Sequence, residues 1–409
     1  MLIIGFMEGA LPERGGLGLL GPHNILRALA ERGHEVAIAA CGACTPGQEK
    51  YLAATVVSAL ARKQGAGSFG VVLFRAAKQW AFGPSMLWRL NRHVRRADFV
   101  SLHSLYSFPV LAGYLLARLH GVPYGVWPHG VLAAAQRRVS PRKKRVYEAV
   151  ITKWMLKTAS VVFFSAAGET TEGAELVNGT PGVIIPDGID VSEFKALPPR
   201  GGFRSRYVGG HDGPLIVCIG RLNAKKGLDL LIRAIARTSQ CRKNVRLVII
   251  GPADPPRFRE QVTSWIKEAG MEAIAHVTAA ISPTEKLQAL ADADVFVSTS
   301  EAENFGFAIF EAMACGVPVV VSDTLHYAEE IRRRQAGFVV PRTAQSFAEA
   351  VVSLLDDEGL RHRMGANGRS LAKTVSLEET GAKLEKTIQS VVEGRPLPPD
   401  LVSAVDVRA

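Results

Sequence analysis

Short apolar strands alternate with helical segments along this chain, and this alternation constrains the fold more than any other feature. Strands that alternate with helices form parallel sheets whose faces are covered by the crossover helices. Two such series are visible. Their strand candidates lie at residues 2–6, 35–40, 99–103, 124–127 and 161–165, and then at 215–219, 246–250, 275–278, 295–298 and 318–322. The pattern predicts an α/β protein with two Rossmann-like domains facing a cleft.

The length of 409 residues suits two domains of about 200 residues each better than one core. We expect the first domain at residues 1–195 and the second at 196–375. The segment 195–213 is rich in Pro, Gly, Arg and His and lacks periodicity, which favours a linker there. Residues 376–409 would add a late helix at 376–392, which could cross back to the first domain, and then a loose tail.

Charge and the absence of leader segments limit the class of protein. No apolar run reaches the ~18–20 residues of a membrane span, and the N-terminus begins directly as a strand without the basic lead of a signal peptide. We therefore expect a cytoplasmic protein. Lys and Arg number 49 against 38 acidic residues, which favours phosphate-bearing partners. The five cysteines include one C-x-x-C, Cys41 and Cys44, but nothing nearby completes a zinc site.

Two glutamates, Glu303 and Glu311, stand with seven residues between them in the most informative stretch of the chain. Glu303 falls in a loop after an apolar strand, and Glu311 falls on a helix that we expect to open near Phe305. The N–H groups at a helix N-terminus attract anions, and Gly306 lets a ligand approach the backbone closely. A nucleotide-sugar, with hydroxyls at both ends and a diphosphate between them, fits this layout. Acids near a helix start also occur in any doubly wound fold, because they offset the helix dipole.

A basic loop follows the strand at 215–219. Arg221 offers a planar fork of donors and Lys226 a mobile point charge, which together suit a diphosphate. Fixed cations at this point would stabilise the charge that a leaving nucleoside diphosphate gains. A solvated basic turn is the alternative, and we prefer it for Lys225. The sequence has no D-x-D motif in a loop, where such a motif would hold a metal. We therefore expect neither a metal nor another cofactor.

The first half of the chain contributes weaker motifs. The glycine loop at residues 15–18, which includes Gly16, allows a tight turn close to a ligand, although it lacks the full dinucleotide fingerprint. His129 follows the strand at 124–127, so its loop should face the cleft. A lone histidine is more often structural than catalytic, but the position favours a role for His129 beside a substrate. His103, at the end of another strand, is a weaker candidate.

Together these motifs resemble the donor-site signature of the retaining glycosyltransferases of the GT-B fold, family 4 (glycosyl transferases group 1). The resemblance implies that Glu303 contacts the transferred sugar, that Glu311 binds the ribose, and that His129 and Glu303 are the catalytic residues. It also implies same-face attack by the acceptor hydroxyl, whose proton goes to the leaving phosphate. The implied donor-binding residues are Gly16, Arg221, Lys226, Glu303, Asn304, Phe305, Gly306, Phe307 and Glu311.

The acceptor is expected to be a saccharide, and we favour a lipid-linked one in the synthesis of exopolysaccharide, lipopolysaccharide or another cell-surface glycan. Basic segments from Arg89 to Arg96 and from Arg137 to Arg145 suit an anionic membrane, so the protein could lie on the inner face of the cytoplasmic membrane. Aromatic residues between Trp80 and Leu90 suggest an amphipathic surface. Packing of that segment on the domain's own core is equally compatible with the pattern.

Three rival functions share some of these features. A nucleotide-sugar 2-epimerase could use the same fold, but the register of Glu303 and Glu311 and the basic first domain argue against it. A non-catalytic protein could close on a sugar nucleotide, but the intact diphosphate-binding set argues against that. Nucleic-acid binding rests on charge alone, without a recognition motif, so we expect no nucleic-acid partner.

Overall fold

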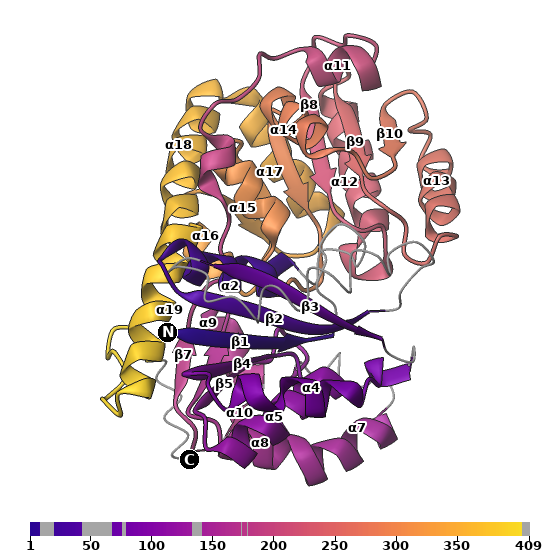
Figure 1. Cartoon of the computed structure of the whole chain (residues 1–409). Helices are drawn as coiled ribbons and strands as arrows, with labels where there is room; N and C mark the ends of the chain where they lie inside the picture. The colour runs from indigo at the N-terminus through magenta and orange to yellow at the C-terminus, as the bar shows by residue number, and fades with distance from the viewer. Residues whose placement is uncertain are drawn as a thin grey trace. The chain divides into compact units, whose positions relative to one another are not determined.

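The computed structural model describes residues 1–8, 20–42, 68–75, 79–132, 141–172, 174–177 and 179–402. The chain divides into two compact units, the first comprising Met1–Gly188 with Leu377–Ala409 and the second Ile189–Ser376. Each unit is built on a parallel β-sheet with helices on its faces (Figure 1). The predicted α/β class with two Rossmann-like sheets is confirmed. Among the described residues, no helix is both long and apolar enough to cross a membrane.

The described part of the first unit holds seven parallel strands in the order β3-β2-β1-β4-β5-β6-β7. Their bounds are β1 (Leu2–Met7), β2 (Glu35–Gly42), β3 (Phe69–Arg75), β4 (Phe99–His103), β5 (Tyr124–Trp127), β6 (Val161–Phe164) and β7 (Gly182–Ile184). The inner strands β4, β5 and β6 are buried along their whole length, which is why their sequences are mostly apolar. The two edge strands, β3 and β7, are absent from the predicted series.

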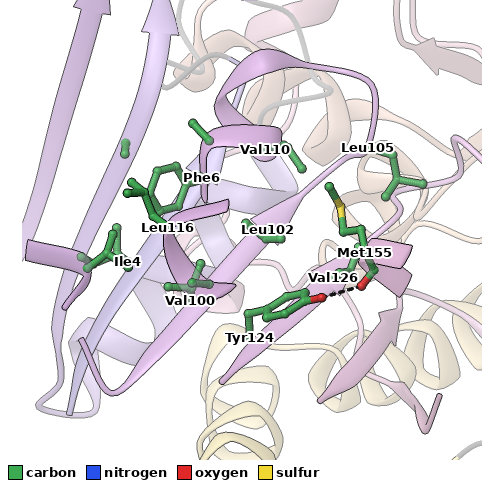
Figure 2. Packing of buried hydrophobic residues seen from close by; sticks show 14 of the residues in the cluster. Ile4, Phe6, Val100, Leu102, Leu105, Val110, Leu116, Tyr124, Val126 and Met155 are labelled. Carbon is green, nitrogen blue, oxygen red and sulfur yellow. Dashed lines mark hydrogen bonds between the residues drawn. The ribbon is translucent and has the colours of Figure 1, made fainter. Parts of the chain in front are cut away.

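Helices cover both faces of this sheet. One face carries α4 (Ser85–Val94), α5 (Phe108–His120), α8 (Lys153–Lys157) and α10 (Ala174–Val177), whose buried side chains share a core cluster with alternate strand residues. Figure 2 shows this core, in which the hydroxyl of Tyr124 donates to the backbone oxygen of Met155 at 2.7 Å. The short elements η2 (Gln79–Ala81), α7 (Pro141–Tyr147), η3 (Glu148–Thr152) and α9 (Ala167–Glu172) complete the unit.

The other face of the sheet carries α2 (Leu20–Glu31) and the late helix α19 (Leu377–Val392), which returns to the first unit. The carboxylate of Glu385 on α19 accepts a hydrogen bond from Arg32 at 2.6 Å and lies 2.8 Å from Nε2 of His34. The chain beyond Gly394 is not the expected loose tail as far as it is described. Leu401 is buried, and its backbone oxygen accepts from the N–H of Ile184 at 3.2 Å.

The second unit has a six-stranded parallel sheet in the order β10-β9-β8-β11-β12-β13 among the described residues. The strands are β8 (Leu215–Ile219), β9 (Arg246–Ile250), β10 (Ala275–Thr278), β11 (Val295–Ser298), β12 (Val319–Ser322) and β13 (Gly337–Val340). The helices are α11 (Gly202–Tyr207), α12 (Leu228–Cys241), α13 (Phe258–Glu268), α14 (Pro283–Asp292), α15 (Phe307–Ala314), α16 (Ala328–Arg333), α17 (Ala344–Asp356) and α18 (Glu358–Thr374), with η4 (Val191–Phe194) before them. The order of the strands reverses between β8 and β11.

The segment 195–213 is not a linker, because its polar residues are used inside the second unit. Phe203 of α11 is buried, and the guanidinium of Arg204 donates to the backbone oxygens of His211, Gly213 and Asp292 and to the carboxylate of Asp294. The division between the units lies earlier, after Gly188. The φ of Gly188 is 79°, in the left-handed region that glycine adopts readily.

Candidate functional site

The loops after β8 and β11 lie side by side at the switch point of the second sheet. The two strands are parallel neighbours, so their carboxyl ends meet where ligands of open α/β sheets bind. Hydrogen bonds join the two loops. The hydroxyl of Thr299 donates to the backbone oxygens of Lys226 and Gly227 at 2.9 Å each, and the N–H of Glu301 donates to the backbone oxygen of Lys225 at 2.8 Å. The topology therefore brings the predicted basic loop and the first predicted glutamate together.

Lys226 and Glu303 form an ion pair across these loops. Lys226 ends η5 (Ala224–Lys226), and its Nζ contacts Oε1 of Glu303, which also accepts from the hydroxyl of Ser300 at 2.7 Å. Each charged side chain keeps 19% of its surface exposed. The ammonium and the carboxylate are therefore held in place at the site yet remain accessible. The sequence predicted both residues, but it did not predict their contact.

Cys218 on β8 lies close to this ion pair but contributes no nucleophile. Burial raises the pKa of its thiol to about 12, with the charges of Lys226 and Glu303 acting on it in opposite directions. The thiol therefore stays protonated at neutral pH.

Glu311 is held by a partner that the sequence did not indicate. The side chain lies on α15 with 8% of its surface exposed, and Nζ of Lys286 on α14 is 2.6 Å from its Oε1. A buried carboxylate needs such a partner, because an unpaired charge out of water is costly. Nothing in the sequence distinguishes Lys286 from a solvated lysine, since the contact exists only after α14 and α15 pack.

The helix that carries Glu311 begins two residues later than expected. Gly306 is its N-cap, with a φ of 85° that places it in the left-handed region, and Phe307 is the first helical residue. The side chain of Phe305 is buried and stacks on Phe310 with ring centroids 4.6 Å apart. Phe305 can therefore meet a ligand only through its backbone, whereas Asn304 is exposed.

Arg221 and Lys225 differ in their surroundings. The Arg221 guanidinium is 39% exposed and lies 3.3 Å from the carboxylate of Asp254, which is itself 57% exposed. Such an exposed pair adds little stability, so the guanidinium can turn to another anion at small cost. Lys225 is exposed, in agreement with the solvated role preferred for it. Gly16 lies outside the described residues.

In the first unit, His129 lies in the loop after β5 and contacts His103 at the end of β4. The two strands are parallel neighbours, and Nδ1 of His103 lies 3.0 Å from Nε2 of His129. The hydroxyl of Ser101 lies 3.0 Å from the other ring nitrogen of His103. Burial, and secondly His129, hold the pKa of His103 well below its usual range, so His103 is neutral. The weaker of the two predicted histidines is therefore the structural partner of the stronger one.

Two buried carboxylates that the sequence did not indicate surround His129. Oδ1 of Asp187 lies 3.6 Å from Nδ1 of His129, and Asp187 is 4% exposed. Glu169 accepts from the N–H of Gly130 at 2.6 Å and from the N–H and hydroxyl of Ser165 at 2.8 Å each. The approach of Asp187 to His129 depends on the order of the strands, which no local pattern records.

Comparison with known proteins identifies the two halves of the chain. A family model described as "Glycosyl transferase 4-like domain" matches residues 22–187, and one described as "Glycosyl transferases group 1" matches residues 204–371. A phosphatidyl-myo-inositol mannosyltransferase of Mycobacterium leprae is 24% identical over 76% of this chain and 78% of its own length. An alpha-D-kanosaminyltransferase of Streptomyces kanamyceticus is 29% identical over 78% of this chain and 83% of its own.

The solved structures agree on the fold. Alr3699/HepE of Anabaena, in complex with UDP and glucose, superposes with a TM-score of 0.74 at 19% identity, covering 95% of this chain and all of that one. A likeness at this identity shows that the two chains share the GT-B architecture.

Proposed function

Because this chain belongs to the GT-B glycosyltransferases of family 4, we propose that it moves a sugar from a nucleotide-diphosphate donor to an acceptor hydroxyl with retention of configuration. The observation that carries this proposal is the pair of held carboxylates in the second unit, Glu303 with Lys226 and Glu311 with Lys286. They flank the N-terminus of α15 at the switch point of the sheet, where a diphosphate is favoured. That arrangement suits a ligand with hydroxyls at both ends.

The surroundings of four predicted donor residues suggest their roles. Lys286 holds one oxygen of Glu311, so the other oxygen can accept from a ribose hydroxyl. Lys226 and the exposed Arg221 supply positive charge to the diphosphate. Glu303, fixed by Lys226 and Ser300, would accept a hydrogen bond from the transferred sugar.

The proposed step breaks the bond between the anomeric carbon and the phosphate oxygen while the acceptor oxygen bonds to the same face of that carbon. The acceptor proton passes to the departing phosphate. Negative charge grows on the leaving diphosphate, and Lys226 and Arg221 stabilise it where it develops. We propose that these two cations, with the α15 N-terminus, serve without a metal ion or other cofactor.

Thermal unfolding tests the donor site. UDP-, GDP-, ADP- and dTDP-sugars would be added in turn to the wild type, to Glu311→Ala, and to Glu272→Ala, an exposed glutamate of the same unit. A ligand at 100 times its Kd stabilises the native state by about 2.7 kcal/mol. We expect one nucleotide series to raise the Tm of the wild type and of Glu272→Ala but not of Glu311→Ala. No shift with any member at concentrations well above millimolar would refute the proposal.

The first unit also presents a surface suited to a lipid-linked acceptor. We name the outer surface of α4, α5, α7, η3 and α8 the basic apolar face. Its exposed large apolar side chains are Trp88, Leu115, Leu119, Val146, Val150 and Trp154, whereas residues 189–376, all described, contribute none of this kind. The helices α4, α5, α7 and α8 contain no Asp or Glu and several Lys and Arg.

This combination of exposed apolar and basic side chains favours an anionic membrane surface. The segment from Trp80 to Leu90 both packs on the core of the domain and forms an amphipathic surface, which are the two roles considered for it. Met86 and Leu90 are buried in the core, while Trp88 is 65% exposed and points away from it. We propose that a cytoplasmic enzyme docks by this face on the inner side of the membrane, where a lipid-linked saccharide is its acceptor. Of the second basic segment, residues 137–140 lie outside the described residues.

Vesicle sedimentation tests this docking. Reversal of Arg92, Arg95 and Arg96 to Glu would remove three exposed charges of α4 and its C-terminal end. Each basic residue near an anionic surface contributes roughly 1 kcal/mol, so binding to phosphatidylglycerol vesicles should fall about 100-fold. Three exposed cations of the second unit, reversed to Glu in the same way, form the control: Arg233, Lys243 and Lys267. Equal binding of the α4 variant and the wild type would contradict the docking.

A further inference from the structure

A groove lies between α18 and the segment 191–200 of the second unit, and we name it the α18 groove. Two pockets of about 470 and 500 Å³ form it, and they are continuous because Leu197 and Arg369 line both. Ala314, the last residue of α15, also lines the groove, whereas the candidate donor site lies at the first residues of the same helix. The α18 groove is therefore a second concave surface, at the other end of α15 from the donor site.

Four cations along this groove have no carboxylate partner. They are Lys195 on one wall and Arg361, Arg369 and Lys373 on α18. Within the part of the chain that the structure describes, none of the four forms an ion pair. Two carboxylates also line the groove, but one of them, Asp294, already pairs with two arginines. The groove therefore carries an excess of positive charge, which attracts an anionic partner.

The cations of α18 follow one side of the helix. Arg369 and Lys373 come eight and twelve residues after Arg361, so at about 3.6 residues per turn all three fall within about a third of the circumference. Twelve residues of helix rise by about 18 Å. An extended chain covers that distance in about five or six residues, at about 3.3 Å each. The row of cations therefore matches a short extended peptide in length, whereas a single phosphate group would contact only part of it.

The other side chains of the lining distinguish between classes of partner. Most of them are apolar, including Phe194, Leu197 and Leu290. Among the described residues, the lining contains no Ser, Thr, Asn, Gln, Tyr or Trp. The hydroxyl groups of a saccharide would find few partners there, and nucleic-acid bases would find no Tyr or Trp on which to stack. A partner that combines acidic and apolar groups suits this surface best.

Backbone oxygens hold the two arginines of the groove in place. Nη1 of Arg361 donates to two backbone oxygens in the last turn of α17, at 2.6 and 3.0 Å. Nη2 of Arg369 donates to the backbone oxygen of Cys315 at 2.9 Å. These bonds cap α17 and α15, but they leave other N–H groups of each guanidinium available for a partner. The two lysines make no such bond, so helix capping does not account for them.

We propose that the α18 groove binds an extended segment of a partner protein in which acidic and apolar residues alternate. Successive side chains of an extended chain point in opposite directions. The carboxylates would therefore face the exposed cations at the rim, while the apolar side chains enter the pockets beside Phe194 and Leu197. The inference goes beyond the proposed function, because it gives the second unit a protein partner and does not depend on the donor site.

Fluorescence anisotropy with labelled peptides tests the chemistry of the partner. The probe is a peptide of alternating Glu and Leu, about six residues long, added to the full chain. Two further peptides carry Gln in place of every Glu, or Ser in place of every Leu. An exposed ion pair contributes up to about fivefold in affinity, so loss of all the carboxylates should weaken binding at least about tenfold. Loss of the leucines should weaken it at least as much, because their burial is lost. Equal binding of either altered peptide would overturn the proposal.

Two matched double variants locate the binding. Lys195→Glu with Lys373→Glu reverses the two exposed cations that hold no backbone oxygen, so the fold should persist, and the Tm checks this. Lys243→Glu with Lys267→Glu makes the same change at exposed positions elsewhere in the second unit. We expect the groove variant to lose at least about tenfold in affinity for the Glu-Leu peptide and the control variant to bind it as the wild type does.

The remaining outcomes of these measurements overturn the proposal. Equal peptide binding by the groove variant and the wild type would place the peptide on another surface, such as the basic apolar face. No peptide binding by the wild type at concentrations well above millimolar would leave the groove without this partner. Phosphatidylglycerol vesicles are the last probe. Vesicle binding that only the groove variant loses, without any peptide binding, would assign the groove to a membrane instead.

Discussion

Replacing Lys286 with methionine tests how the second unit holds Glu311. The substitution keeps the apolar stem but leaves the carboxylate of Glu311, 8% exposed, without the ammonium now 2.6 Å from it. Breaking a fully buried pair costs about 3–5 kcal/mol, whereas an exposed pair contributes 0–1 kcal/mol. Because Lys286 keeps 27% of its surface in water, we expect a loss of about 2 kcal/mol. For a unit of this size that lowers the Tm by roughly 4–8 °C.

A double-mutant cycle isolates the pair from other effects. Thermal unfolding of Lys286→Met, Glu311→Gln and the double variant should reveal a coupling of about 1–2 kcal/mol. Lys267→Met, on the exposed surface of α13, is the control for loss of a lysine charge and should change the Tm little. Lys286→Met should also weaken binding of the stabilising nucleotide about tenfold, because Glu311 is no longer oriented. A coupling below about 0.5 kcal/mol would refute the argument that Lys286 fixes the carboxylate.

Three further substitutions test the framework of the protein. Gly306→Ala forces a side chain into a φ of 85° and should cost about 1–2 kcal/mol, measured by urea unfolding, with weaker nucleotide binding because α15 no longer starts at the same residue. Gly365→Ala places a Cβ 2.1 Å from a backbone oxygen just after α15 and should destabilise the second unit by about 1–3 kcal/mol in the same assay. Burial raises the pKa of Glu385, but hydrogen bonds from Arg32 and His34 outweigh it, so the folded pKa lies below the ordinary 4.5. The stabilisation that the ionised Glu385 contributes is therefore present above pH 4.5 and is lost as the pH falls through the folded pKa. Glu385→Gln should remove this part of the fall in Tm at acid pH, measured by thermal unfolding.

Local sequence patterns were sufficient for the inner strands of both sheets. The buried strands β4, β5, β8, β9 and β11 begin where the apolar runs begin, because a strand covered on both faces is mostly apolar. Glu303 and Glu311 could be recognised because the loop, the glycine N-cap and the first helical turns are contiguous, so their spacing is a property of one segment. Even there, Gly306 shifted the helix start beyond Phe305 through its left-handed backbone.

The sequence by itself therefore determined the two alternating α/β series and the family, whereas its choice of carboxylates and cations in the second unit stays a prediction. Only the tertiary structure decided their partners: Lys286 for Glu311, and His103 with Asp187 for His129. It also brought the segment 195–213 into the second unit. The physical reason is the separation along the sequence over which each kind of interaction acts. Propensity and periodicity act between residues a few positions apart, whereas these contacts join residues brought together by strand order and helix packing, which no local pattern records.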